Sequence, residues 1–226
     1  MEASWTVAIS SRTEADLLEV RTEHKTQNIK IFPMDVSDLE QTASTIEEIE
    51  RNFGVPDLVI LNAGTHLPVS VENFSVDAVR HLIEINFMGV VNALSEIIPR
   101  FINSGGGHIA VVASLAGYRG LPTASAYGAS KAALINMCEA LRPDLMRHNI
   151  RLTLVNPGFV ETPLTDKNEF NMPFIVSSEE AAKQIFNGLK KNHFEITFPK
   201  KLALPMKVLR LLPYKLFFAL TKRMTR

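Results

Sequence analysis

Cysteine is almost absent from this chain, which carries only Cys138 among its 226 residues. A single cysteine excludes an intrachain disulfide and leaves no cysteine cluster for structural zinc. Cys138 lies in an apolar helical run, where we expect a small buried thiol rather than a reactive one. The sequence therefore predicts no disulfide scaffold and no metal site, and it fits a reducing cytoplasm.

An excess of charge of either sign is also missing, because 24 Lys and Arg residues balance 24 Asp and Glu residues. A neutral chain argues against nucleic acid as a partner. No uninterrupted apolar run reaches the roughly 20 residues that a membrane span needs, and the amino terminus lacks a basic-then-apolar secretion pattern. We therefore expect one globular domain in the cytoplasm.

Acidic residues are absent from the last part of the sequence. After Glu195 there is no Asp or Glu, and leucines and phenylalanines alternate with Lys200, Lys201, Lys207, Arg210, Lys215, Lys222, Arg223 and Arg226. We divide the chain into a main domain, 1–197, and a basic, apolar tail, 198–226. This tail could lie peripherally on an anionic membrane, cover an apolar substrate site, or pack against its own domain.

Apolar strand-like runs alternate with helical patterns along the main domain. The apolar periodicity predicts helices over Thr13–His24, Leu39–Phe53 and Phe74–Phe101, the second capped by Ser37 or Asp38. Strands are predicted at Trp5–Ser11, Ile29–Phe32, Leu58–Leu61, Ile109–Ala113 and Ile150–Val155. This alternation predicts an α/β fold with a Rossmann-like, doubly wound parallel sheet, in which ligands bind at the carboxyl ends of the strands.

Three polar residues stand where such a sheet would bind a ligand. Ser114 follows an apolar strand, and Tyr127 and Lys131 are four residues apart in an Ala-rich helical run, so they share one helix face. An ammonium group beside a phenol lowers the phenol pKa and makes it a usable acid or base. The alternative to a functional pair is a tyrosine that only packs in the helix, with a solvated lysine one turn away.

Other polar residues follow the neighbouring strands. The loop Asn62-Ala63-Gly64 follows the Leu58 strand, Asn86 interrupts an amphipathic helix, and Pro157-Gly158 follows the Ile150 strand. Together with Ser114, Tyr127 and Lys131, these residues closely resemble the short-chain dehydrogenase/reductase family. The resemblance runs from about Trp5 to about Leu189.

The resemblance implies an oxidoreductase that interconverts a small-molecule carbonyl compound and a secondary alcohol by hydride transfer. Ser114 would bind the substrate oxygen, and Tyr127 would donate or accept the proton. Lys131 would lower the pKa of Tyr127 and hold the nicotinamide ribose, and Asn86 would hold a water of the proton relay. The family also implies a homodimer or homotetramer. A relative that keeps the fold and binds partners without turnover is the alternative.

The resemblance also implies a set of coenzyme contacts. Ser11 stands where an NAD-selective acid would sit, and the adjacent Arg12 would bind a 2′-phosphate, so NADP(H) is expected rather than NAD(H). The remaining contacts expected by resemblance are Asp35 and Val36 at the adenine, Asn62, Ala63 and Gly64 along the coenzyme, and Pro157, Gly158, Val160 and Thr162 at the nicotinamide. The segment Leu164–Val176 occupies the position of the family's substrate lid.

One part of the family pattern is missing. The family begins with a strand, a Gly-rich turn and a helix that seat the coenzyme pyrophosphate. Here Met1 leads directly into what corresponds to the second strand, so we expect an N-terminally truncated domain in which the Trp5 and Ile29 strands are not paired with the Leu58 strand. We expect Met1 to be an internal methionine of a longer chain, or this product to bind little NADP(H).

Overall fold

The computed structural model describes residues 5–24, 28–165 and 172–222. Four strands form one parallel sheet in the order β3 (Leu58–Leu61), β4 (Gly107–Val112), β5 (Ile150–Pro157) and β6 (Glu195–Phe198). The side chains from Ile109 to Val111 are fully buried, which explains why this strand is a continuous apolar run. The predicted parallel α/β architecture is confirmed.

The two N-terminal strands form a separate sheet. β1 (Val7–Ser11) pairs with β2 (Ile29–Pro33) in parallel, and within the described ranges no strand joins β1 to β3. The expected break in strand pairing is therefore confirmed. Apolar side chains on both sides of it remain half exposed, with 40% of Val7 and 46% of Ile60 accessible. The expectation for Met1 falls outside the described residues.

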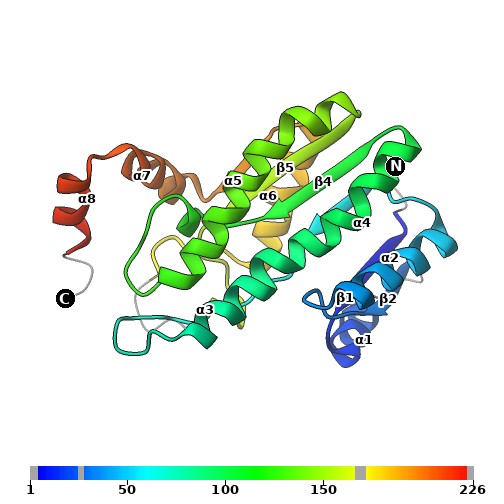
Figure 1. Cartoon of the computed structure of the whole chain (residues 1–226), viewed down its shortest axis with the longest axis horizontal. Helices are drawn as coiled ribbons and strands as arrows, with labels where there is room; N and C mark the ends of the chain where they lie inside the picture. The colour runs from blue at the N-terminus through cyan, green and yellow to red at the C-terminus, as the bar shows by residue number, and fades with distance from the viewer. Residues whose placement is uncertain (1–4, 25–27, 166–171, 223–226) are drawn as a thin grey trace.

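Helices cover the strands, and their bounds are α1 (Glu14–Glu23), α2 (Leu39–Phe53), α3 (Val76–Ile83), α4 (Gly89–Ser104), α5 (Ser125–Arg147), α6 (Ser178–Lys190), α7 (Lys200–Leu211) and α8 (Tyr214–Thr221). The predicted cap of α2 is Asp38, whose carboxylate accepts a hydrogen bond from the Gln41 backbone N–H at 3.0 Å. The described residues also include a π-helical turn η1 (Glu84–Met88) and a 3₁₀ turn η2 (Leu115–Gly117). In Figure 1, α7 and α8 extend at one end of the molecule, opposite the unit formed by β1, α1, β2 and α2.

The segments α3, η1 and α4 join into one continuous helix, Val76–Ser104. By length and apolar composition alone, this helix is long enough to cross a membrane. Part of its apolar face instead belongs to the protein core, because Leu82, Val90 and Phe101 are at most 4% exposed. Cys138 on α5 is fully buried in the same core, as predicted.

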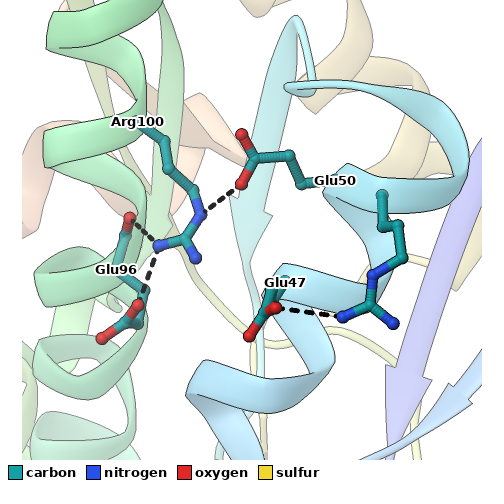
Figure 2. Close-up of polar contacts among 5 residues, drawn as sticks. Glu47, Glu50, Glu96 and Arg100 are labelled. Atoms are coloured by element: carbon teal, nitrogen blue, oxygen red, sulfur yellow. Dashed lines mark hydrogen bonds and ion pairs between the residues drawn. The ribbon is translucent and has the colours of Figure 1, made fainter.

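Polar contacts between α2 and α4 connect the N-terminal unit to the main sheet. Arg100 on α4 donates to Glu50 on α2 at 2.8 Å and to Glu96, one turn earlier on α4, at 2.8 Å (Figure 2). Nearby, the Asn92 side chain donates to the Val36 carbonyl oxygen at 2.9 Å. Side-chain contacts therefore hold the N-terminal unit where backbone pairing is broken.

Candidate active site

Ser114 lies at the carboxyl end of β4, where the buried strand turns into η2. Its hydroxyl accepts a hydrogen bond from the Ala116 N–H at 3.1 Å and so caps the short helix. The same hydroxyl donates to the Pro157 carbonyl oxygen at 3.5 Å, at the end of β5. Ser114 is 8% exposed and lines a cavity. The fold thus presents its hydroxyl at the sheet edge predicted for ligand binding.

Tyr127 and Lys131 lie on the first two turns of α5, on one face, as their spacing predicts. Lys131 is only 4% exposed, so the alternative of a solvated lysine is wrong. Its Nζ donates to the Val112 carbonyl oxygen at 2.9 Å and lies 5.9 Å from the centre of the Tyr127 ring. The lysine therefore ties α5 to the strand that delivers Ser114.

Burial controls the ionisation of both groups. Desolvation lowers the pKa of Lys131 to about 8. The pKa of Tyr127 is raised above its ordinary value of 10 by burial, against the opposing effect of a hydrogen bond with Ser114. The sequence predicts a lowered tyrosine pKa, and the structure differs because desolvation dominates while the ammonium bonds to Val112. At neutral pH the phenol is protonated and can donate a proton.

Asn86 lies in the π-helical turn η1 and is fully buried. Its amide accepts from the Thr65 N–H at 2.7 Å and donates to the Thr65 carbonyl at 2.9 Å and to the Ser130 hydroxyl at 3.1 Å. Single π-turns in helices are frequent at functional sites, since they redirect one side chain. Asn86 thus braces the loop after β3 against α5, and its relay role stays a prediction.

Gly64 brings this loop close to both residues. A Cβ atom at this position would lie 3.2 Å from Asn86 Oδ1 and 3.5 Å from Lys131 Nζ. Only glycine lets the backbone approach without displacing one of these polar atoms. The three residues therefore form one packed unit behind the cavity.

The cavity itself has a volume of about 1720 Å³ and lies at the carboxyl ends of β3, β4 and β5. Of the residues predicted for catalysis or coenzyme binding, its wall includes Asn62, Gly64, Ser114, Tyr127, Lys131, Pro157, Gly158, Val160 and Thr162. Residues from three separate strand ends therefore meet in one place. Among the other predicted residues, Ala63 and Asn86 do not line the wall, and neither do Arg12, Asp35 and Val36.

Arg12 and Asp35 form a second group, after β1 and β2. The Asp35 carboxylate accepts from the Ser37 hydroxyl at 2.6 Å and from its N–H at 2.9 Å. These two hydrogen bonds lower the pKa of Asp35 against its desolvation, and the charge of Arg12 adds to them. Val36 packs on α4, since a Cβ at Gly89 would lie 2.6 Å from its Cγ2 atom. The predicted contacts thus lie in two groups on either side of the break between the sheets.

Several residues of the cavity wall escaped the sequence prediction. The His66 ring meets the Tyr127 ring edge to face, with centres 4.8 Å apart. The position of His66, two residues after Gly64, was a signal available in the sequence. Leu202, Met206 and Leu209 reach the wall from α7, in line with the predicted alternative in which the tail covers an apolar site.

A family model of the short chain dehydrogenases matches residues 1–172. The chain belongs to this family. It is also 34% identical over 220 residues to an uncharacterized oxidoreductase of Myxococcus xanthus, an alignment that covers 96% of this chain and 87% of the relative. The family resemblance stated from the sequence is confirmed, and with it the class of oxidoreductase.

Solved structures agree with the fold. A short-chain dehydrogenase from Streptomyces avermitilis matches with a TM-score of 0.81 and 21% identity, over 98% of this chain and 88% of that one. A 3-ketoacyl-ACP reductase from Sinorhizobium meliloti matches with a TM-score of 0.75 and 25% identity, over 85% and 87%. The family binds NAD or NADP, and its solved members include complexes with each.

Proposed function

We propose that this protein is an NADP(H)-dependent oxidoreductase that interconverts a small carbonyl compound and a secondary alcohol. The observation that carries this proposal is the convergence of Ser114, Tyr127 and Lys131 on one cavity wall at the sheet edge. A neutral phenol, a buried ammonium and a hydroxyl in one cavity are the groups that carbonyl reduction needs.

Residues of this chain would supply the proton and hold the substrate. In the reducing direction, the Ser114 hydroxyl donates a hydrogen bond to the substrate oxygen and stabilises its developing negative charge. The coenzyme, when bound, supplies the hydride that reduces the carbonyl carbon. Tyr127 then gives its proton to the substrate oxygen. The positive charge of Lys131 stabilises the phenolate that remains, and the pair is reprotonated from solvent.

The residues at the cavity fit the nicotinamide end of such a coenzyme. Gly64 and Gly158 contribute only backbone to the wall. A Cβ at Gly158 would lie 2.8 Å from Leu202 Cδ2, so glycine is needed there for the close packing of α7. Lys131 would hold the ribose, and Val160 and Thr162 would contact the carboxamide. At the other end, Arg12 supports a preference for NADP(H), since its guanidinium suits a 2′-phosphate.

The break between β1 and β3 favours a second candidate function, a binding protein without turnover. This break lies between the two groups of predicted coenzyme contacts. A protein that keeps the cavity but binds the coenzyme weakly would therefore fit the same structure. Turnover distinguishes the two candidates. With the enzyme we also propose a cytoplasmic location and a homodimer or homotetramer. Light scattering would measure the oligomeric state.

A panel of ketones, aldehydes and secondary alcohols, followed at 340 nm with NADPH or NADP, tests the proposed function. We expect turnover with at least one substrate and a fall in turnover of about 10² or more in the Tyr127→Phe variant. Tyr214→Phe is the matched control, since Tyr214 is an exposed phenol on α8 outside the cavity wall. Coenzyme binding by calorimetry with no turnover on any substrate would favour the second candidate.

A further inference from the structure

Helix α7 has two apolar faces. Its inner face carries Leu202, Met206 and Leu209, which line the cavity. Its outer face carries Leu204, Val208 and Leu211, which are 63%, 60% and 83% exposed. At 100° per residue these two sets point to opposite sides of the helix. Packing against the domain therefore accounts for one face only, and the second apolar face needs its own explanation.

Helix α8 adds to the outer surface. Tyr214, Leu216, Phe218 and Leu220 are each between 49% and 68% exposed. At 100° per residue Leu216 and Leu220 share one side of α8, and Leu220 lines a groove together with Leu204, Val208 and Leu211. These two residues and the outer face of α7 form what we name the α7–α8 surface, at the end of the molecule seen in Figure 1. Monomeric proteins rarely expose so many large apolar side chains on two consecutive helices, and such patches mark interaction sites.

The domain holds this surface in position. The Arg119 guanidinium lies 4.7 Å from the centre of the Tyr214 ring and 4.6 Å from that of Phe217. It also donates to the backbone carbonyls of Arg210 and Leu212, each at 3.2 Å. Arg119 therefore fixes the turn between the two helices, so specific contacts with the domain hold the apolar surface in position.

Charge indicates what the surface meets. The chain has no acidic residue after Glu195, so both helices carry positive charge alone. Two of the basic side chains pair with the domain, Lys207 with Glu195 at 2.5 Å and Arg210 with Glu139 at 3.4 Å. Lys200 and Lys215 are exposed on the two helices that carry the apolar surface. Apolar side chains flanked by lysines are the pattern of helices that bind anionic membrane surfaces.

We propose that the α7–α8 surface docks on an anionic lipid membrane. Leu204, Leu211 and Leu216 enter the boundary between headgroups and acyl chains, while Lys200 and Lys215 contact lipid phosphates. A second copy of the chain would also bury apolar side chains. A contact between two copies would gain nothing from the positive charge of α7 and α8, since the lysines of the two copies would repel each other.

Vesicle flotation of the full chain tests the proposal. One set of vesicles contains equal parts phosphatidylglycerol and phosphatidylcholine, and the other contains phosphatidylcholine only. We expect at least tenfold stronger binding to the anionic set in 0.15 M salt, reduced in 0.5 M salt by screening. The assay needs no turnover, so its outcome is independent of the proposed function.

Two pairs of variants assign the binding to the surface. Leu204→Ser with Leu211→Ser should weaken anionic binding at least tenfold, and Lys200→Gln with Lys215→Gln roughly tenfold. The matched controls are Val76→Ser with Met146→Ser, at 61% and 62% exposure, and Lys183→Gln with Lys191→Gln, all on other surfaces. Thermal unfolding confirms that each variant is folded.

Three results would overturn the proposal. The first is equal flotation with neutral and anionic vesicles, and the second is unchanged flotation of both surface variants. The third is a parent chain that does not float but forms a dimer that Leu204→Ser with Leu211→Ser dissociates. In that case the occupant of the surface is a second copy of this chain.

Discussion

Lys131 Nζ donates to the Val112 carbonyl oxygen at 2.9 Å. This bond joins the second turn of α5 to the end of β4, so the helix that carries Tyr127 is fixed to the strand that delivers Ser114. Because Lys131 is only 4% exposed, its ammonium is held by the protein rather than by water. The relationship makes the lysine both an electrostatic group and a structural tie.

The first prediction concerns the proton donor. Tyr127→Phe keeps the ring and its contact with His66 but removes the hydroxyl, so kcat should fall by about 10² or more while coenzyme affinity is unchanged. Steady-state rates and a coenzyme titration of the same preparation measure the two quantities. Near-normal kcat in this variant would refute the mechanism.

The second prediction concerns Gly64. In Gly64→Ala the new methyl group crowds Asn86 Oδ1 at 3.2 Å, so we expect roughly a tenfold loss of kcat and a destabilisation of about 1–2 kcal/mol. Gly120→Ala is the control, because a Cβ there has no neighbour within 4 Å. Equal effects in both variants would show that the packed unit of Gly64, Asn86 and Lys131 has no special role.

The third prediction concerns coenzyme choice. Arg12→Gln removes a charge-assisted contact to the 2′-phosphate, which is worth about 1.5–3 kcal/mol, so NADPH affinity should fall roughly 10- to 100-fold. NADH affinity should hardly change. Arg21→Gln, an exposed arginine at the end of α1, is the control. Titrations in which the parent binds NADH as tightly as NADPH would contradict the assignment.

The fourth prediction concerns stability and pH through His108. This side chain is 3% exposed, and its Nε2 lies 2.9 Å from Thr153 Oγ1. Burial, with the nearby charge of Arg151, lowers its pKa to about 4 from an ordinary 6.5. The unfolded chain therefore binds a proton that the folded protein excludes. Stability present above pH 6.5 is lost as the pH falls towards 4, by up to about 3 kcal/mol.

Urea unfolding at pH 7.5, 6.0 and 5.0 measures this loss. His108→Gln keeps a hydrogen-bonding side chain opposite Thr153 but does not titrate, so its free energy of unfolding should fall less between these pH values. The difference between parent and variant isolates the histidine from carboxylates that titrate in the same range. Parallel pH profiles would contradict the prediction.

The sequence predicted the residues whose positions depend on local rules. Tyr127 and Lys131 share a helix face because four residues make about one turn, and Ser114 reaches the site because a parallel strand ends just before it. The strand β3 and the helix α2 have the predicted bounds for the same reason. The break between β1 and β3 followed from the absence of one strand in a known strand order.

Features that depend on distant contacts were not predictable from the sequence. Asn86 in the π-helical turn bonds to both Thr65 and Ser130, which are 21 and 44 residues away, and no local periodicity marks these contacts. The raised pKa of Tyr127 depends on burial in a cavity that α7 helps to close, more than seventy residues later in the chain. The family resemblance supplied roles for residues, but it did not predict the hydrogen bonds of Asn86 or the direction of the pKa shift of Tyr127.

The two faces of α7 also stand between the cavity at the sheet edge and the outside of the protein. Between Leu202 and Leu204 the only partition is one helix backbone, a few ångströms thick. If a substrate displaced α7 from inside, it would change what the outer face of the helix can bind. By thermodynamic reciprocity, a molecule bound outside would then alter the affinity of the cavity by the same factor. The arrangement would thus couple a substrate to an external partner of this helix without any contact between the two.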